Sequence, residues 1–161
     1  MPRLFHDLFP PLPLPEEMRR WDAEAMALGL PEELLMENAA RTALDVLRVY
    51  RPELAGLRIW LLMGGGNNGG DAACLARHLL DAGAEPLVLH TRPLSACKGA
   101  SGRHVRVARA AGVKFERCRP AVFHKGPLPH IIIDGLLGPG FCGSLCPDAL
   151  ELVSTVNALH N

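Results

Sequence analysis

The residues best suited to chemistry begin with a glycine-rich segment, Gly64–Asp71, which reads GGGNNGGD and follows an apolar run. Glycine lets the backbone approach a ligand closely, and the amides of Asn67 and Asn68 supply carbonyl oxygens and N–H donors. A helix starting near Asp71 would present free backbone N–H groups and the positive end of its dipole, which together bind anions such as phosphate. The structural alternative is a plain turn in which Asp71 only caps that helix.

A second segment, Asp134–Ser144, follows another apolar run and reads DGLLGPGFCGS. Asp134 stands at the carboxyl end of a predicted strand, and open parallel sheets bind their ligands outside those ends. Because an unpaired carboxylate is costly to bury, Asp134 indicates a cation, a substrate hydroxyl or a general base, with a turn-forming aspartate as the alternative. The glycines after it would let backbone N–H groups close over a phosphate.

Two familiar nucleotide motifs do not match these segments. The first segment lacks the G-x-G-x-x-G fingerprint with an acid about 20 residues later, and no Lys-Ser/Thr pair follows it as in a P-loop. The residues alone therefore favour a nucleotide or phosphate site of general Rossmann-like type.

The elements that must position these segments alternate along the chain. Prolines predict an extended arm over residues 1–14, and acidic residues after Pro15 and Pro31 predict two leading helices. The leading helices are predicted over 18–28 and 32–50, and the later helices over 71–80, 102–111 and 147–159. The strands are predicted over 57–63, 87–90, 113–116 and 130–134. Residues 117–129 are predicted to form a loop. Short links between alternating strands and helices imply parallel strands. The predicted fold is α/β, a Rossmann-like three-layer α/β/α sandwich with a mainly parallel sheet and two leading helices.

Composition limits the classes of function. The chain has 161 residues, 48% of them hydrophobic and 21% charged, which fits one packed domain. A net charge of zero argues against nucleic acid or an anionic membrane as a partner, and no apolar stretch reaches the roughly 20 residues of a membrane span. The N-terminus lacks a secretory signal pattern, and five scattered cysteines favour a reducing cytoplasm.

Three segments together resemble the YjeF N-terminal domain family. They are Gly66–Asp71 (GNNGGD), Leu35–Ala39 (LMENA) on the preceding helix, and Asp134–Gly138 (DGLLG). Their order and spacing match the family over 15–161, nearly the whole chain. The family comprises NAD(P)H-hydrate epimerases, isomerases of metabolite repair that interconvert the R and S forms of the hydrated cofactors NADHX and NADPHX. The resemblance implies one bound K⁺, a cytoplasmic homodimer, and a companion dehydratase that restores NAD(P)H from the product.

The resemblance also implies roles for particular residues. Asn68 and Asp134 would ligate K⁺, a hard cation that prefers oxygen ligands. Epimerisation through ring opening or reversible loss of the hydroxyl needs an acid–base group, for which Asp134 is the first candidate and Asp71 the second. The substrate-binding residues implied are Asn67, Asn68, Gly69, Gly70, Asp71, Gly138, Pro139, Gly140, Phe141, Cys142, Gly143 and Ser144.

The chain departs from the family pattern in three places. Ala72 and Ala40 stand where glycine is common, both small-for-small changes. The family continues into a further strand with a D-x-P-S-G motif, whose Asp contacts substrate and whose Ser completes the K⁺ shell, whereas this sequence ends at Asn161. We therefore expect a C-terminally shortened domain over 15–161, weak K⁺ binding and an open sheet edge at 130–134. The alternative function is a non-catalytic YjeF-type module that binds a nucleotide or a protein.

Other polar residues have simpler explanations. Cys142 and Cys146 have the spacing of half a zinc site, but no second pair completes it. Arg103, Arg106 and Arg109 predict a solvated helix face, with the extra phosphate of NADPHX as the alternative ligand.

Overall fold

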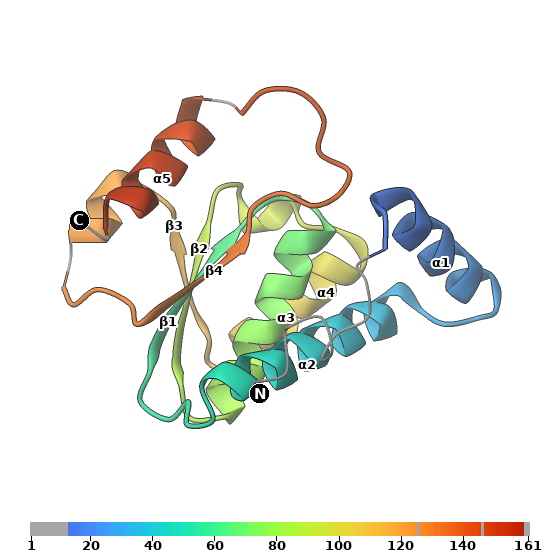
Figure 1. Cartoon of the computed structure of the whole chain (residues 1–161), viewed down its shortest axis with the longest axis horizontal. Coiled ribbons are helices and arrows are strands. Elements are labelled where there is room, and N and C mark those ends of the chain that lie inside the picture. Colours follow the sequence, from blue (N-terminus) through green and yellow to red (C-terminus); the bar gives the residue numbers. More distant parts are fainter. Residues whose placement is uncertain (1–12, 125, 146, 160–161) are drawn as a thin grey trace, which may run out of the picture. The chain divides into compact units, whose positions relative to one another are not determined.

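The computed structural model describes residues 13–159 except 125 and 146 (Figure 1). The chain forms two compact units, Met1–Pro31 and Glu32–Asn161. The described part of the first unit contains one helix, α1 (Pro15–Ala27), which starts three residues earlier than expected. Glu17 accepts a hydrogen bond from the Leu14 N–H at 2.8 Å and so fixes the helix start. Residues 1–12 of the expected proline-rich arm lie outside the described residues.

The second unit carries the sheet. Its helices are α2 (Glu32–Tyr50), α3 (Asn67–Asp81), α4 (Gly99–Ala110) and α5 (Pro147–Ala158), with short 3-10 helices η2 (Leu94–Ala96) and η3 (Pro120–His124). Its strands are β1 (Arg58–Met63), β2 (Glu85–His90), β3 (Lys114–Arg117) and β4 (Ile131–Gly135). The bounds of α2 agree with the sequence prediction, whereas η3 forms where only a loop was expected.

The four strands are parallel and lie in the order β3-β2-β1-β4. Helices α2, α3 and α4 cover one face of this sheet, and η3 and α5 cover the other (Figure 1). The predicted Rossmann-like α/β fold is therefore confirmed. Within the described chain β4 forms one edge of the sheet, as expected, and all four strands end at a common carboxyl edge.

Strand β1 is buried on both faces, which explains its continuous apolar sequence. Ile59, Leu61 and Met63 join the core under α2–α4. Trp60 and Leu62 alternate with them and join the smaller core under α5. Among the described residues, no helix is long and apolar enough to cross a bilayer.

The start of α3 differs from the sequence prediction. The helix begins at Asn67 rather than near Asp71, and its N-cap is Gly66, with no side-chain cap. The predicted helix start near Asp71 was therefore wrong, and so was the alternative in which Asp71 only caps the helix, because Asp71 lies inside it. The glycines are needed for packing: a Cβ on Gly70 would lie 2.8 Å from the Cα of Ser101 on α4.

Candidate functional site

The two glycine-rich segments lie side by side at the carboxyl ends of β1 and β4. Met63 of β1 is in register with Gly135 of β4, and the Gly64 N–H donates to the Gly135 carbonyl at 3.0 Å. Asn68 Nδ2 donates to the Leu137 carbonyl oxygen at 2.7 Å. The structure thus brings together the turn after β1 and the loop after β4, which the sequence linked only through the resemblance.

Close backbone contacts fix this junction. A Cβ on Gly64 would lie 1.9 Å from the Leu136 carbonyl oxygen, and one on Gly135 would lie 2.7 Å from the Cβ of Ala72. Neither position has room for a side chain unless the backbone moves. Glycine is required at both because the turn, the loop and α3 meet here without space between them.

Asp134 lies near the end of β4 and is exposed. It follows Ile132 by two residues, so its side chain lies on the sheet face that α5 covers. Its Oδ1 accepts the Leu136 N–H at 2.8 Å, which is the turn-forming role weighed from the sequence. Because the side chain is exposed, this turn leaves the carboxylate accessible to a ligand.

The two asparagines use their amide N–H groups within the protein. Asn67 Nδ2 donates to Glu32 Oε1 at 2.8 Å, which ties the start of α3 to the start of α2. Asn68 Nδ2 donates to the Leu137 carbonyl oxygen, so Asn68 Oδ1 is the side-chain atom that would coordinate a cation. Asn68 Oδ1 and the Asp134 carboxylate are both oxygen atoms, the donor type that a hard cation such as K⁺ prefers, and their role as its ligands stays a prediction.

The first turn of α3 leaves the backbone N–H groups before Gly70 without a partner inside the helix. The Gly70 N–H donates to the Gly66 carbonyl at 3.2 Å, so helix bonding starts there and the groups before it point out of the helix end. Gly69 and Gly70 are buried. As glycines they could offer a substrate only backbone atoms. Asp71 is half-buried one turn into the helix.

The loop after β4 is mostly exposed. The Phe141 N–H donates to the Gly138 carbonyl at 3.0 Å and closes a turn at its centre. Phe141, Cys142, Gly143 and Ser144 are exposed, and Cys142 is a free thiol. The substrate role of Gly138–Ser144 stays a prediction.

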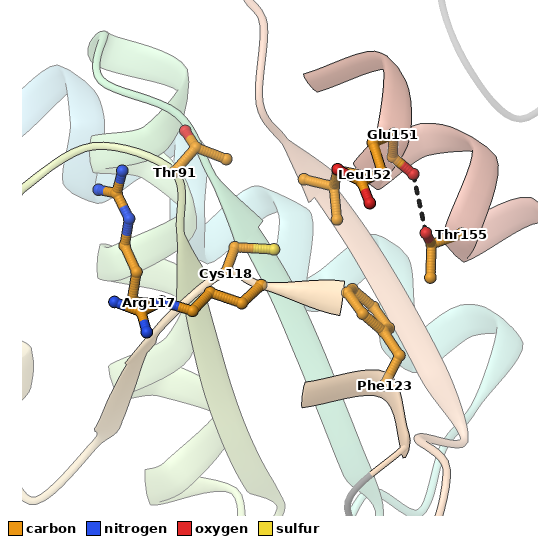
Figure 2. A pocket seen from close by; sticks show the side chains of 8 residues that line it. Thr91, Arg117, Cys118, Phe123, Glu151, Leu152 and Thr155 are labelled. Carbon is orange, nitrogen blue, oxygen red and sulfur yellow. Dashed lines mark hydrogen bonds between the residues drawn. The ribbon is translucent and has the colours of Figure 1, made fainter. Parts of the chain in front are cut away.

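A pocket of about 320 Å³ opens at the carboxyl ends of β2 and β3, beside α5 (Figure 2). Phe123 and Leu152 are buried and form its apolar floor, and Phe123 packs edge-to-face on Trp60 with ring centroids 5.4 Å apart. Arg117 and Arg119 line it as cations. No local pattern predicts this pocket, because its lining comes from elements up to 64 residues apart (Thr91 to Thr155).

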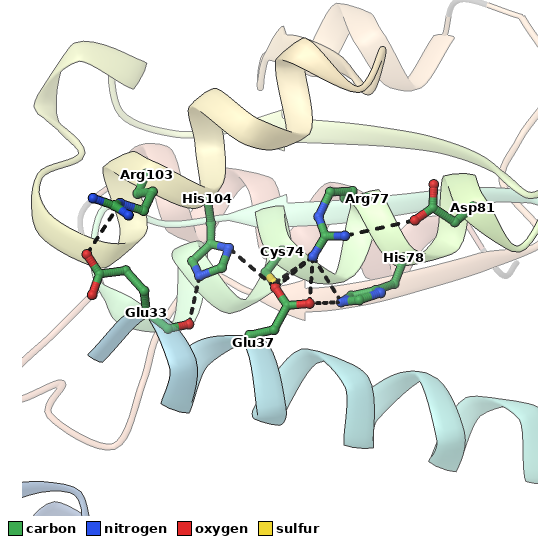
Figure 3. A network of polar contacts seen from close by, with 8 residues as sticks. All are labelled: Glu33, Glu37, Cys74, Arg77, His78, Asp81, Arg103 and His104. Carbon is green, nitrogen blue, oxygen red and sulfur yellow. Dashed lines mark hydrogen bonds and ion pairs between the residues drawn. The ribbon is translucent and has the colours of Figure 1, made fainter. Parts of the chain in front are cut away.

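A polar network on the other face of the sheet joins α2, α3 and α4 (Figure 3). Arg77 Nη2 lies 2.7 and 2.6 Å from the two carboxylate oxygens of Glu37. His78 Nε2 lies 2.8 Å from Glu37 Oε1, and Cys74 Sγ donates to Oε2 at 3.2 Å. His104, on α4, contacts the Glu33 carbonyl oxygen at 3.0 Å. Sequence reasoning missed this network, although Cys74, Arg77 and His78 share one face of α3.

The network sets the protonation states of Glu37 and Cys74. Burial alone would raise the pKa of Glu37, but hydrogen bonds from Arg77 and Cys74 and the positive charge of Arg77 outweigh it and hold the pKa at about 2. Burial and the neighbouring Glu37 carboxylate raise the pKa of the Cys74 thiol to about 12. Glu37 is therefore an anion and Cys74 a neutral thiol at physiological pH.

Three of these side chains have the spacing of metal ligands. The donor atoms of Glu37, Cys74 and His104 lie within 4.8 Å of one another. The Arg77 guanidinium, however, already contacts both Glu37 oxygens and supplies the positive charge. The network therefore ties three helices together, with Arg77 in the place of a metal ion.

The family model described as "YjeF-related protein N-terminus" matches residues 32–161, the whole of the second compact unit. The chain belongs to this family. The segments of the junction, Asn67–Asp71 and Asp134–Ser144, both lie inside the matched region of this YjeF-type domain.

Relatives of the domain have been given functional names. An NAD(P)H-hydrate epimerase of Rhodopirellula baltica is 36% identical over 146 residues, covering 89% of this chain and 58% of the relative. A bifunctional NAD(P)H-hydrate repair enzyme of Thermanaerovibrio acidaminovorans is 34% identical over 142 residues, covering 86% of this chain and 27% of the relative. The chain thus spans little more than half of the first relative and about a quarter of the second.

A crystal structure of the yeast protein ynu0 has the same fold. The two structures superpose with a TM-score of 0.77 at 21% sequence identity, over 93% of this chain and 67% of the yeast chain. At this identity the likeness bears on the fold alone.

Proposed function

We propose that this YjeF-type domain is an NAD(P)H-hydrate epimerase that interconverts the R and S forms of NADHX and NADPHX. The observation that carries the proposal is the hydrogen bond from Asn68 to the Leu137 carbonyl oxygen, which joins two of the segments shared with the family in one site. The name of the Rhodopirellula relative, 36% identical over 146 residues, supports the same activity.

In this proposal the backbone binds the substrate and a carboxylate moves the proton. The N–H groups at the start of α3 and in the loop Gly138–Ser144 would bind the pyrophosphate. Epimerisation, by ring opening or by reversible loss of the hydroxyl, needs a group that gives and takes a proton. Asp134 is exposed at the strand end and is the first candidate for it, with Asp71 second.

We also propose K⁺ as the cofactor, held by Asn68 Oδ1 and the Asp134 carboxylate. When bound, it would neutralise part of the carboxylate charge and orient a substrate phosphate or ribose. Loss of either oxygen ligand should therefore weaken the response to K⁺.

The wider assembly is part of the same proposal. We infer a homodimer in the cytoplasm, with a companion dehydratase that consumes the product. Met18, Trp21 and Met26 of α1 are 40%, 47% and 44% exposed, which supports a surface that a second copy covers. The second activity in relatives named bifunctional repair enzymes supports a partner reaction on the same metabolite.

The deciding test is epimerase turnover on R-NADHX with K⁺ and with Na⁺ in its place. Asp134→Asn keeps an oxygen ligand but removes the basic carboxylate, so we expect turnover to fall roughly 100-fold or more. Glu85→Gln is the matched control, since it removes an exposed carboxylate at the opposite, amino end of the sheet.

Two results would contradict the proposal. Equal turnover of Asp134→Asn and wild type would remove Asp134 from the chemistry. A folded wild-type chain with no turnover, but with measurable binding of NADPH, would support the non-catalytic binding module instead.

A further inference from the structure

The pocket and Asp134 lie on the same face of the sheet. Asp134 follows Ile132 by two residues, and Thr91 follows Leu89 by two; Ile132, Leu89 and Cys118 all belong to the core under α5. Thr91 and Cys118 line the pocket. Asp134 at β4 and the pocket at β2 and β3 are thus two positions along one carboxyl edge.

These two positions are far enough apart for the two halves of a dinucleotide. The strand order places β1 and β2 between β4 and β3, so three strand spacings, about 14 Å, separate the outer strands. A pocket of about 320 Å³ is at the small end of ligand sites and has room for one nucleoside. An elongated ligand with its hydrated ring at Asp134 would reach the pocket with its other nucleoside.

The strand order also indicates which half belongs in the pocket. In doubly wound sheets of order 3-2-1-4 the pyrophosphate lies at the turn after the first strand, and the adenosine ribose lies at the end of the second. The turn here lacks the usual glycine fingerprint, but its position in the fold is the same. Strand β2 ends at His90, and the next residue, Thr91, lines the pocket.

The charge around this end of β2 favours a phosphate over a free ribose hydroxyl. NAD-selective enzymes place an acid there, which binds the ribose 2′-OH, whereas an arginine accommodates a 2′-phosphate. Arg92 follows the end of β2 by two residues, and the neighbouring acid on β3 is Glu116, in register with Leu89. Two further cations, Arg117 and Arg119, line the pocket, whose one acidic residue is Glu151 on α5.

The floor of the pocket suits a base. Phe123 and Leu152 are 3% and 5% exposed, so their apolar atoms face the pocket from a fixed core. Burial raises the pKa of Cys118 to about 11, although the Arg117 charge opposes it, so the thiol there is neutral. An uncharged floor beneath a cationic rim matches a purine beside a phosphate.

We propose that this pocket binds the adenosine half of the hydrated dinucleotide and that Arg117 and Arg119 bind its 2′-phosphate. The inference rests on the proposed epimerase function and deepens it, since it predicts that NADPHX is preferred over NADHX.

The binding test uses fragments that need no turnover. Adenosine 2′,5′-bisphosphate and 5′-AMP are titrated calorimetrically into the whole chain, its double variant Arg117→Gln/Arg119→Gln, and the control Arg106→Gln/Arg109→Gln on α4. We expect wild type and control to bind the bisphosphate at least about 10-fold more tightly than 5′-AMP, and the pocket variant to lose that difference. Loss in the α4 control alone, or no preference in wild type, would overturn the pocket assignment.

A kinetic arm separates this inference from the function beneath it. The pocket variant should raise KM for NADPHX about 10-fold, with kcat and the NADHX reaction unchanged. Equal changes in KM for NADPHX and for NADHX in the pocket variant would overturn the role of Arg117 and Arg119. Fragment discrimination without turnover of either substrate would instead count against the epimerase proposal and leave the adenosine 2′-phosphate site supported.

Discussion

Replacing Glu37 with glutamine tests how strongly the polar network ties α2 to α3. Glutamine keeps an oxygen that accepts a hydrogen bond from Arg77 but removes the charge. A pKa lowered from 4.5 to about 2 corresponds to about 3 kcal/mol of native-state stabilisation at neutral pH. Solvent reaches 27% of the Glu37 side chain and screens the interaction, so we expect Glu37→Gln to lower the free energy of unfolding by about 1–2 kcal/mol.

The pH dependence gives this prediction a sharper form. Between pH 4.5 and about 2 the native protein binds fewer protons at Glu37 than the unfolded chain does. The free energy by which the ionised Glu37 stabilises the native state therefore rises with pH in this range. It is fully present above pH 4.5 and is lost as the pH falls through the native pKa. The gap between wild type and variant should therefore be constant from about pH 7 to pH 5 and should narrow toward pH 3.

Urea unfolding followed by far-UV circular dichroism, at pH 7, 5, 4 and 3, measures this gap. Glu33→Gln is the control on the same helix, because Glu33 makes a surface ion pair with Arg103 at 3.5 Å and should cost less than about 0.5 kcal/mol. A gap for Glu37→Gln that stays the same from neutral to acid pH would refute the electrostatic reasoning. So would a gap no larger than that of the control at neutral pH.

Two further predictions concern packing and thiol reactivity. Gly70→Ala places a Cβ 2.8 Å from the Cα of Ser101, so overpacking of about 1–3 kcal/mol should outweigh the helix propensity of alanine and lower the midpoint of urea unfolding. Gly66→Ala, whose Cβ meets nothing within 4 Å, should leave that midpoint almost unchanged; equal effects would contradict the packing argument. With an excess of a thiol reagent at pH 8, peptide mapping should find Cys142 labelled long before Cys74, because Cys142 is exposed and the pKa of Cys74 is about 12. Early labelling of Cys74 in the folded chain would contradict the buried, hydrogen-bonded position of this thiol in the polar network.

Local sequence signals predicted the elements that depend on near neighbours. The helix 32–50 was placed correctly because acidic residues after Pro31 and an apolar stripe of helical period both lie within the segment. Strand β1 was recognised from a continuous apolar run, and its burial on both faces confirms that reasoning. The parallel sheet followed from the alternation of strands with helices.

The same kind of reasoning misplaced the start of α3. Glycine and asparagine are turn-forming residues by local propensity, so Asn67–Gly70 was expected to precede the helix. The structure places these residues inside the helix, and the glycine at position 70 serves the close approach of α4 rather than a turn. Whether a glycine serves a turn or a helix contact depends on a neighbour distant in sequence.

The sequence by itself determined the fold class and identified the residues of the two glycine-rich segments. Only the tertiary structure decided how those segments meet: Asn68 and Leu137 are joined across 69 positions, and Glu37 and Arg77 across 40. The physical reason is that periodicity and turn preferences act over a few residues. Which distant side chains come into contact depends on the strand order and on how closely the helices pack against the sheet.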